Sequence, residues 1–262
     1  MNQYPLRLQF SVGTSVISKG HVLLSPPFFR RQLIFSLDSF DFTFLRINSY
    51  YDWATIHEIF VRREYDSRKF SVHGQIIAYY EELTKETIPL ILDLGANIGV
   101  AAAYISRQFP EARIVAVEPA SRNIALLKEN TSKVSAIRVL HAAVGAESGA
   151  MSLFDPGVGN NAFRAFGSDS EYLETVPGIT INEIVSDNPD CVPFLVKIDV
   201  EGFEKELFSR NTSWVDFFKV IVVETHDWML PGQAVSSNLL AALGGKKRDL
   251  IFQGENLFSV RV

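Results

Sequence analysis

Short apolar segments alternate with amphipathic segments from about residue 88 onward, and this alternation limits the fold more than any other feature of the chain. The apolar segments predict strands at 90–94, 114–117, 137–141, 194–198 and 220–223, with helices near 98–109, 121–130, 201–209 and 233–243. Strands that are apolar on both faces and alternate with helices predict a parallel sheet with helices on both faces. The last residues, 248–262, break the alternation, because two strand-like segments flank Gly254 with no room for a helix between them. They predict an antiparallel hairpin.

The first third of the chain has a different character. It holds 16 of the 31 aromatic residues, enough apolar surface to support a packed structure. Its periodicity predicts strands at 6–12 and 40–47 and a helix at 52–65 capped by Asp52. We therefore predict a small N-terminal α/β cap over residues 1–87, close to the substrate, followed by a main domain over residues 88–262.

Composition removes several classes of protein. The chain has 262 residues with 25 Lys and Arg against 30 Asp and Glu, a net charge of −5. Proteins that bind nucleic acid without sequence preference normally carry a basic excess, so we expect no nucleic-acid partner. No apolar run reaches the ~18–20 residues of a transmembrane helix, and the N-terminus lacks a signal-peptide pattern. The single cysteine, Cys191, excludes an internal disulfide framework. We predict a cytoplasmic protein.

The strongest local motif is LILDLGANIGVAAAY at 90–104. An apolar strand ends at Asp93, and a turn through Gly95 and Gly99 leads into a helix. Gly95 would let the backbone approach a ligand, and Gly99 would let the helix pack on the strand. A dinucleotide fingerprint needs a second glycine where this chain has Asn97. An acidic turn also suits a cationic ligand better than a pyrophosphate.

The next two strand ends extend this candidate cofactor site. Glu118 follows Gly95 by 23 residues, and a carboxylate there can accept both hydroxyls of a ribose. The small residues of HAAVG (141–145), Ala143 among them, could lie along an adenine. The alternative is that Asp93 and Glu118 only cap the helices that follow them. His141 is expected to be a structural histidine.

LVKIDVEGFEKELF at 195–208 places charged groups at the end of another apolar strand. Lys197 and Asp199 share one face, and Glu201 begins the predicted helix, where the helix dipole would stabilise its negative charge. The structural alternative makes Asp199 an N-cap. A buried lysine needs a partner, so an ion pair from Lys197 to Glu201 or Glu224 is preferred to a catalytic lysine.

VIVVETHDW at 220–228 repeats the pattern at the next strand end. Glu224 and His226 share a face, and Asp227 follows as a candidate substrate contact. Ligands of such sheets lie beyond the carboxyl ends of the strands, so Asp199, Glu224 and His226 are predicted to converge and one of them to act as the base. A divalent metal is the weaker alternative, with candidate ligands among Asp199, Glu201, Glu224, His226 and Asp227, and no metal ligand is assigned.

These motifs, in this order, resemble the class I S-adenosylmethionine-dependent methyltransferases and, within them, the FkbM family. The resemblance covers residues 44–262 and rests on DLGANIG, VEP, AAVG, KIDVEGFE and VVETHD. It implies a Rossmann-like, seven-stranded, mostly parallel sheet that ends in the predicted hairpin. It also implies S-adenosylmethionine as the donor. The candidate cofactor-binding residues are Asp93, Gly95, Asn97, Gly99, Glu118, Ala143 and Asp199; the candidate catalytic residues are His226, Asp199, Glu224, Lys197 and Glu201.

The resemblance further implies O-methylation of a hydroxyl on a sugar, glycan, lipid or other small molecule. The polar, glycine-rich stretch 150–180 is predicted to be a long loop over the site, with Asn161, Phe163 and Arg164 as candidate acceptor contacts. Two rival functions stay open: a nicotinamide-dependent oxidoreductase or epimerase on the same sheet, and a non-catalytic binding module.

Overall fold

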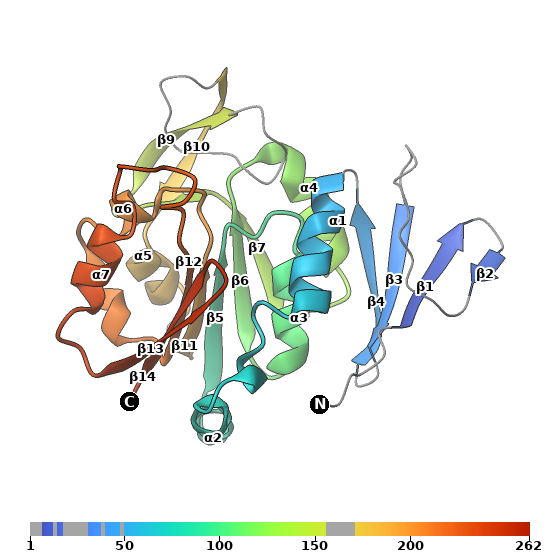
Figure 1. Ribbon diagram of the computed structural model, residues 1–262, viewed down its shortest axis with the longest axis horizontal. Coiled ribbons are helices and arrows are strands. Elements are labelled where there is room, and N and C mark those ends of the chain that lie inside the picture. Colours follow the sequence, from blue (N-terminus) through green and yellow to red (C-terminus); the bar gives the residue numbers. More distant parts are fainter. Residues whose placement is uncertain (1–6, 13–14, 18–30, 38–39, 48–49, 156–170) are drawn as a thin grey trace.

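A seven-stranded sheet forms the centre of the molecule in the computed structural model, which describes residues 7–12, 15–17, 31–37, 40–47, 50–155 and 171–262 (Figure 1). Its strands in spatial order are β13 (Arg248–Gln253), β14 (Asn256–Arg261), β12 (Val220–Glu224), β11 (Cys191–Ile198), β5 (Ile88–Leu94), β6 (Arg113–Glu118) and β7 (Ile137–His141). The pairs among β12, β11, β5, β6 and β7 are all parallel. The predicted Rossmann-like architecture is confirmed.

The predicted hairpin at the end of the chain is also present. Strand β14 runs antiparallel to both β13 and β12, and Gln253 pairs with Asn256 across the turn. Gly254 has a φ of +60°, in the left-handed region that glycine adopts at little cost. The glycine therefore fixes where the two strands reverse.

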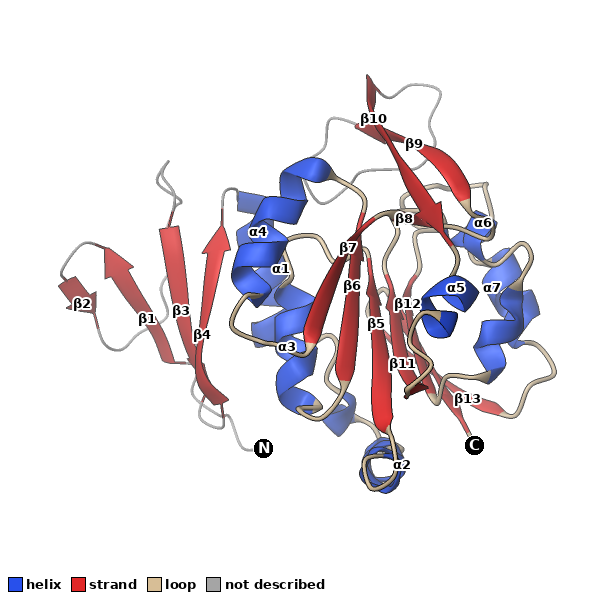
Figure 2. Ribbon diagram, turned by 180° about the vertical axis from the view of Figure 1, so that it is seen from behind, coloured by secondary structure: helices blue, strands red, loops and turns tan. Residues whose placement is uncertain are grey.

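Helices cover both faces of the sheet, as expected for strands that are apolar on both sides (Figures 1 and 2). Alternate residues of one strand enter different cores: Leu90 and Leu92 face one side and Ile91 the other. One face carries α3 (Val100–Gln108) and α4 (Ser121–Thr131). The other carries α5 (Ile181–Ser186), α6 (Glu204–Leu207), the 3₁₀ helix η3 (Thr212–Asp216) and α7 (Ser237–Leu243). No helix within the described ranges has the length and apolarity needed to cross a membrane.

The N-terminal helices share the core of the sheet. These are α1 (Tyr50–Ile56), the π-helical segment η1 (His57–Arg62), the 3₁₀ turn η2 (Ser67–Lys69) and α2 (His73–Leu83). Phe60 packs edge-on against Tyr104, with ring centroids 5.2 Å apart. Tyr80 of α2 meets Phe109 and Phe194 at 5.0 and 5.4 Å. The prediction that Asp52 caps this segment is wrong, because α1 already begins at Tyr50.

A second, four-stranded antiparallel sheet forms the far end of the molecule. Its order is β2 (Ser15–Ile17), β1 (Arg7–Val12), β3 (Arg31–Leu37) and β4 (Phe40–Ile47). Strand β4 lies beside α3 and α4, so the sheet covers the outer side of the helical layer (Figure 1). Both predicted N-terminal strands are therefore present. The boundary near residue 88 stays a prediction.

A third, three-stranded sheet replaces part of the loop predicted at 150–180. Strand β10 (Glu171–Ile179) pairs antiparallel with β9 (Gly149–Asp155) and parallel with the short β8 (Ala143–Val144). The prediction of a continuous loop is wrong for these strands, because each finds a partner in the other. Residues 156–170 lie outside the described part of the chain, so Asn161, Phe163 and Arg164 do too.

Candidate active site

A cavity of about 130 Å³ opens at the carboxyl ends of the parallel strands. It lies across β5 and β11, where the strand order reverses, which is where ligands of such sheets bind. Its wall is built by the loop after β5, the end of β6, residues 142–144, the segment after β11 and the end of β12. Helix α1 and segment η1 supply the remaining side through residues such as Thr55, Glu58 and Ile59.

The loop after β5 is shaped by close contact with other parts of the chain. Gly95 has a φ of +78°, and a Cβ there would lie 1.7 Å from the backbone oxygen of Asp199. At Gly99, with a φ of +87°, a Cβ would lie 2.7 Å from Leu127 of α4. The sequence suggested a ligand beside Gly95 and a strand beside Gly99. The structure places the backbone after β11 beside Gly95 and the helix α4 beside Gly99, and Gly95 also lines the cavity, so a ligand close to Gly95 stays a prediction.

Glu118 stands at the end of β6 with 4% of its surface exposed. Its Oε2 accepts a hydrogen bond from the Asn97 backbone N–H at 2.9 Å. Its Oε1 accepts from the Ala120 N–H and from Asn123 Nδ2, both at 3.0 Å. Burial raises the pKa of Glu118 to about 7 in spite of these three donors. The carboxylate therefore holds the loop after β5 in place and reaches the cavity wall.

Asn97 is the residue that stands where a dinucleotide fingerprint has glycine. Its φ of +49° is left-handed, a conformation that asparagine tolerates better than most residues. Its Oδ1 is buried and has no hydrogen-bond partner within the described structure. Asn97 lies on the cavity wall, as does Ala143 with its neighbours 142 and 144. The wall thus combines one unused acceptor with a small apolar strip.

Lys197 closes the base of the site with an ion pair to the neighbouring strand. Its Nζ lies 3.2 Å from Asp93 Oδ1 and 3.2 Å from Asp199 Oδ2, and it donates to the Gly95 carbonyl at 2.9 Å. Burial by itself lowers the pKa of Lys197, but the charges of Asp93 and Asp199 raise it well above its ordinary value. The prediction that Lys197 pairs with Glu201 or Glu224 is wrong, because Asp93 and Asp199 are its partners. Asp93 is completely buried behind Lys197.

The segment after β11 turns sharply before its helix. Glu201 and Gly202 both have left-handed backbones, with φ of +53° and +90°. Helix α6 therefore begins at Glu204, three residues later than predicted. The prediction that Glu201 lies in the first turn of the helix is wrong, and its side chain instead joins the cavity wall.

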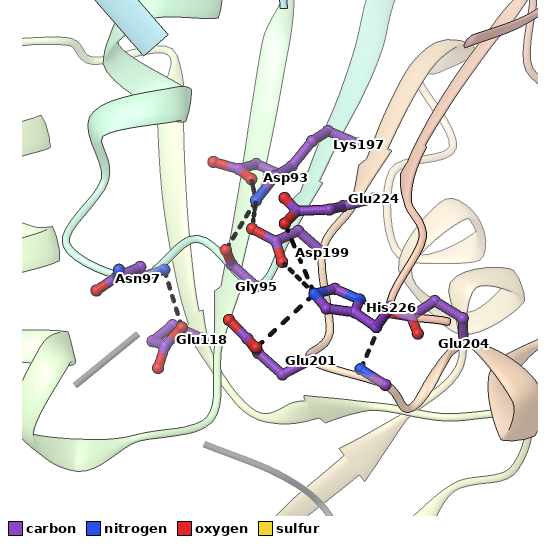
Figure 3. A network of polar contacts seen from close by, with 11 residues as sticks. Asp93, Gly95, Asn97, Glu118, Lys197, Asp199, Glu201, Glu204, Glu224 and His226 are labelled. Carbon is purple, nitrogen blue, oxygen red and sulfur yellow. Dashed lines mark hydrogen bonds and ion pairs between the residues drawn. The ribbon is translucent and has the colours of Figure 1, made fainter. Parts of the chain in front are cut away.

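His226 lies behind that wall, surrounded by carboxylates (Figure 3). Its Nδ1 is 2.9 Å from Glu204 Oε1, and both side chains are almost completely buried. Its Nε2 faces three further oxygens, 3.8 Å from Asp199 Oδ1 and 3.7 Å from both Glu201 Oε2 and Glu224 Oε1. Asp199, Glu201 and Glu224 are 20–24% exposed, so they stand between His226 and the cavity.

These contacts determine the charge of the cluster. Burial by itself lowers the pKa of His226, but the hydrogen bond with Glu204 and the surrounding carboxylates raise it to about 10. Burial and the charge of Asp199 raise the pKa of Glu224 to about 9. His226 is therefore positively charged at neutral pH. It balances part of the negative charge around it.

The structure brings together most of the residues singled out from sequence. Asp199, Glu201, Glu224 and Lys197 line one end of the cavity, whereas Asp227 accepts hydrogen bonds from the Ser236 N–H in the following loop.

Sequence reasoning did not single out three further residues. Glu204 fixes the His226 ring, although it belongs to the KIDVEGFE motif, where a third carboxylate near the helix start was the available signal. Glu58 and Tyr65 reach the cavity from the N-terminal segments. No local pattern distinguished them, because only tertiary packing places them there.

The sheet order, the antiparallel hairpin and the position of the cavity define an α/β protein of the Rossmann-like class with a ligand site at its topological switch point. Residues 93–249 match the methyltransferase FkbM domain. The chain belongs to the FkbM methyltransferase family, and the resemblance seen in its motifs is confirmed.

Individual relatives are more distant. Methyltransferase sdnD of Sordaria araneosa is 31% identical over 40% of this chain and 38% of its own length. Hexuronic acid methyltransferase AglP of Haloferax volcanii is 28% identical over 52% of this chain and 56% of its own. The chain thus spans about half or less of these relatives. The crystal structure of precorrin-6y C5,15-methyltransferase from Geobacter metallireducens GS-15 is 14% identical, with a TM-score of 0.37 over 74% of this chain and 90% of that one.

Proposed function

We propose that the protein transfers the methyl group of S-adenosylmethionine to a hydroxyl group of a sugar or other small molecule. One observation carries the proposal. A single cavity connects a buried ribose-type carboxylate, Glu118, with the acidic cluster of Asp199, Glu201 and Glu224 at the adjoining strand ends. Family membership supports methyl transfer, and the cavity supplies a place for both reactants.

The residues at the Glu118 end suit the nucleoside half of the donor. Glu118 Oε1 already accepts two hydrogen bonds and Oε2 one, which leaves an acceptor position on Oε2 for a ribose hydroxyl. The unused Oδ1 of Asn97 offers a second acceptor on the same wall. The apolar strip at 142–144 would lie against the adenine. Gly95 and Asn97 contribute by holding the loop open in its left-handed conformation.

The other end of the cavity suits the positively charged half of the donor. Three acidic side chains face it, of which Glu224 keeps its proton at neutral pH because burial raises its pKa to about 9. The nearby ammonium of Lys197 is already occupied by Asp93, Asp199 and the Gly95 carbonyl. Opposite charges attract more strongly where water is partly excluded. These carboxylates would therefore hold the donor with its sulfonium directed towards the acceptor, and Asp93 would act through Lys197 rather than by direct contact.

The donor supplies an electrophilic methyl group on sulfur. The protein must place an acceptor hydroxyl in line with it, and orientation of two bound reactants is worth about 7–11 kcal/mol. As the oxygen–carbon bond forms and the carbon–sulfur bond breaks, the hydroxyl proton passes to a carboxylate of the cluster. Base assistance contributes ~10²–10⁴-fold. Positioning by the cavity walls is therefore the larger contribution.

The acceptor is proposed to be a hydroxyl group of a sugar or glycan. The relative AglP is named a hexuronic acid methyltransferase, which supports an acceptor of the sugar type. The acidic side chains on the cavity wall disfavour an anionic group of that acceptor at the reacting end. Glu58 and Glu64, contributed by the N-terminal segments, add to this acidic lining. The segment 150–180 and Asp227 stay candidate acceptor contacts, and a cytoplasmic location stays a prediction.

A transfer assay tests the proposal directly. The full chain is incubated with S-adenosylmethionine labelled in the methyl group and with a panel of hydroxylated glycans and small molecules. We expect label in at least one acceptor, in a bond that survives alkaline hydrolysis, because methyl ethers resist base and methyl esters do not. Label released by base, or hydride transfer from a nicotinamide cofactor with no methyl transfer, would contradict the proposed reaction.

A further inference from the structure

We propose that Asp199, Glu224 and His226 bind a divalent cation such as Mn²⁺ at the closed end of the cavity. The three residues of this cluster support the cation site without reference to the proposed reaction. Only its role, which is to hold the acceptor hydroxyl, rests on the proposed function.

The spacing of the donor atoms is the first reason. The Nε2 atom of His226 is 3.8 Å from Asp199 Oδ1 and 3.7 Å from Glu224 Oε1, and donor atoms of all three residues lie within 4.8 Å of one another. These separations are too long for hydrogen bonds. Ligands of one metal ion bound at about 2.0–2.2 Å stand roughly 3–4 Å apart. One cation could therefore contact all three donor atoms, which Figure 3 shows facing one another.

The state of His226 is the second and independent reason. Only 2% of the surface of His226 is exposed. Of its two ring nitrogens, only Nδ1 has a hydrogen-bond partner in the described part of the chain, the buried Glu204 at 2.9 Å. Nε2 points instead at the three carboxylates (Figure 3). A histidine that is fixed by a carboxylate on one nitrogen and presents the other is the usual arrangement of a metal ligand.

The surroundings direct each donor atom to the site. Lys197 takes Asp199 Oδ2 and leaves Oδ1 facing His226. Glu204 is a positioning residue that holds the ring, and the Gly202 N–H in turn contacts Glu204 at 3.3 Å. Because strands β11 and β12 are adjacent and parallel, the residues that follow them emerge side by side. The donor set thus depends on the rigid sheet.

The donor types select the kind of cation. Two carboxylates and one imidazole suit Mn²⁺ or a similar oxygen-preferring divalent ion better than a thiolate-seeking metal. Three protein ligands leave positions open on the cavity side, beside Glu201. When the cation binds, the Nε2 proton of His226 and the carboxyl proton of Glu224 both pass to solvent, as ligand protons do on metal binding. A hydroxyl at an open position would lose its own proton more readily.

Mn²⁺ titration of the metal-stripped full chain, followed by the electron paramagnetic resonance signal of free Mn²⁺, tests the site without any turnover. We expect one Mn²⁺ per chain. Glu224→Gln should lower the affinity at least about tenfold, and Glu204→Gln should lower it about tenfold or more through the loss of ring orientation. The matched control is Glu58→Gln, which removes a carboxylate from the same cavity but not from the cation site.

A wild-type chain that binds no Mn²⁺ at millimolar concentration overturns the inference. Equal losses in Glu224→Gln and Glu58→Gln also overturn it, since general charge attraction would then explain the binding. Melting curves of each variant check that the fold is intact. S-adenosylhomocysteine is titrated into the same metal-free protein. If the protein binds S-adenosylhomocysteine but not Mn²⁺, only the cation site is overturned. If it binds Mn²⁺ but not S-adenosylhomocysteine, only the proposed methyl donor is overturned.

Discussion

At the scale of single residues, Lys197 shows what sequence reasoning can and cannot provide. A lysine near the end of an apolar strand predicted a buried charge with a partner, and the structure contains that ion pair. The partner was misassigned because it depends on strand register. Lys197 lies directly beside Asp93 in the pairing of β11 with β5, and nothing local in either segment states that alignment. Charge burial was predictable, whereas its geometry was not.

Glu118 leads to a prediction about pH. Burial raises its pKa from the ordinary 4.5 to about 7, so between these pH values the unfolded chain has lost a proton that the folded chain keeps. Folding stability therefore falls as pH rises from 4.5 to 7, by up to about 3 kcal/mol, and is level in this respect above 7. Glu118→Gln should lack this loss.

Urea unfolding of the wild type and of Glu118→Gln at several pH values between 4.5 and 8 measures the effect. The quantity compared is the difference between the two free energies of unfolding, so pH effects from other groups cancel. A difference that does not change with pH would show that Glu118 is ionised as readily in the folded protein as in the unfolded one.

At the scale of elements, the strands of the main sheet were predictable because their apolar composition is local. The observed bounds extend the predicted ones by three residues or fewer at each end. The helix predicted at 201–209 begins only at Glu204, because Glu201 and Gly202 adopt left-handed backbones. Those conformations arise where the chain enters the site. The departure from simple periodicity therefore coincides with a candidate functional segment.

The loop after β5 gives a prediction at the same scale. Gly95→Ala would place a Cβ 1.7 Å from the Asp199 backbone oxygen and strain a φ of +78°. We expect a loss of about 2–4 kcal/mol in the free energy of unfolding, because the backbone of one loop must move. The control is Gly74→Ala in helix α2, where a Cβ meets nothing within 4 Å. That change should stabilise the protein by ~0.5–1 kcal/mol.

Chemical denaturation of the two variants beside the wild type provides the comparison. If Gly95→Ala unfolds at the same denaturant concentration as the wild type, the loop is not held against the segment after β11 as described. The close contact between Gly95 and the Asp199 backbone would then not determine the shape of the site.

At the scale of the whole molecule, the sequence predicted the sheet, its hairpin and the gathering of charged residues at the strand ends. It placed the N-terminal segment close to the substrate, but it did not predict which N-terminal residues line the cavity. Glu58 and Tyr65 reach the wall because η1 packs on helix α3, where Phe60 meets Tyr104, and α2 packs on the sheet, where Tyr80 meets Phe194. That docking depends on complementary shapes of distant segments, which local patterns do not encode.

The central sheet and the helices beside it also explain why one cavity can hold two reactants. The parallel strands deliver Glu118 to one end and the acidic cluster to the other, while the N-terminal helices cover the opening from the side. Donor and acceptor would then meet between the rigid sheet and a helical wall. In this arrangement the donor depends on Glu118, and the reaction depends on the cluster around His226.

The most direct test of the central claim is a calorimetric titration of the full chain with S-adenosylhomocysteine, beside NAD⁺. We expect saturable binding of S-adenosylhomocysteine at one site per chain and no binding of NAD⁺. Glu118→Ala should weaken the affinity about 10- to 100-fold, since a hydrogen bond to a charged group contributes about 1.5–3 kcal/mol. Glu81→Ala, on the exposed surface of α2, should leave it unchanged. Binding of NAD⁺ in place of S-adenosylhomocysteine, or an affinity that Glu118→Ala does not alter, would contradict the account.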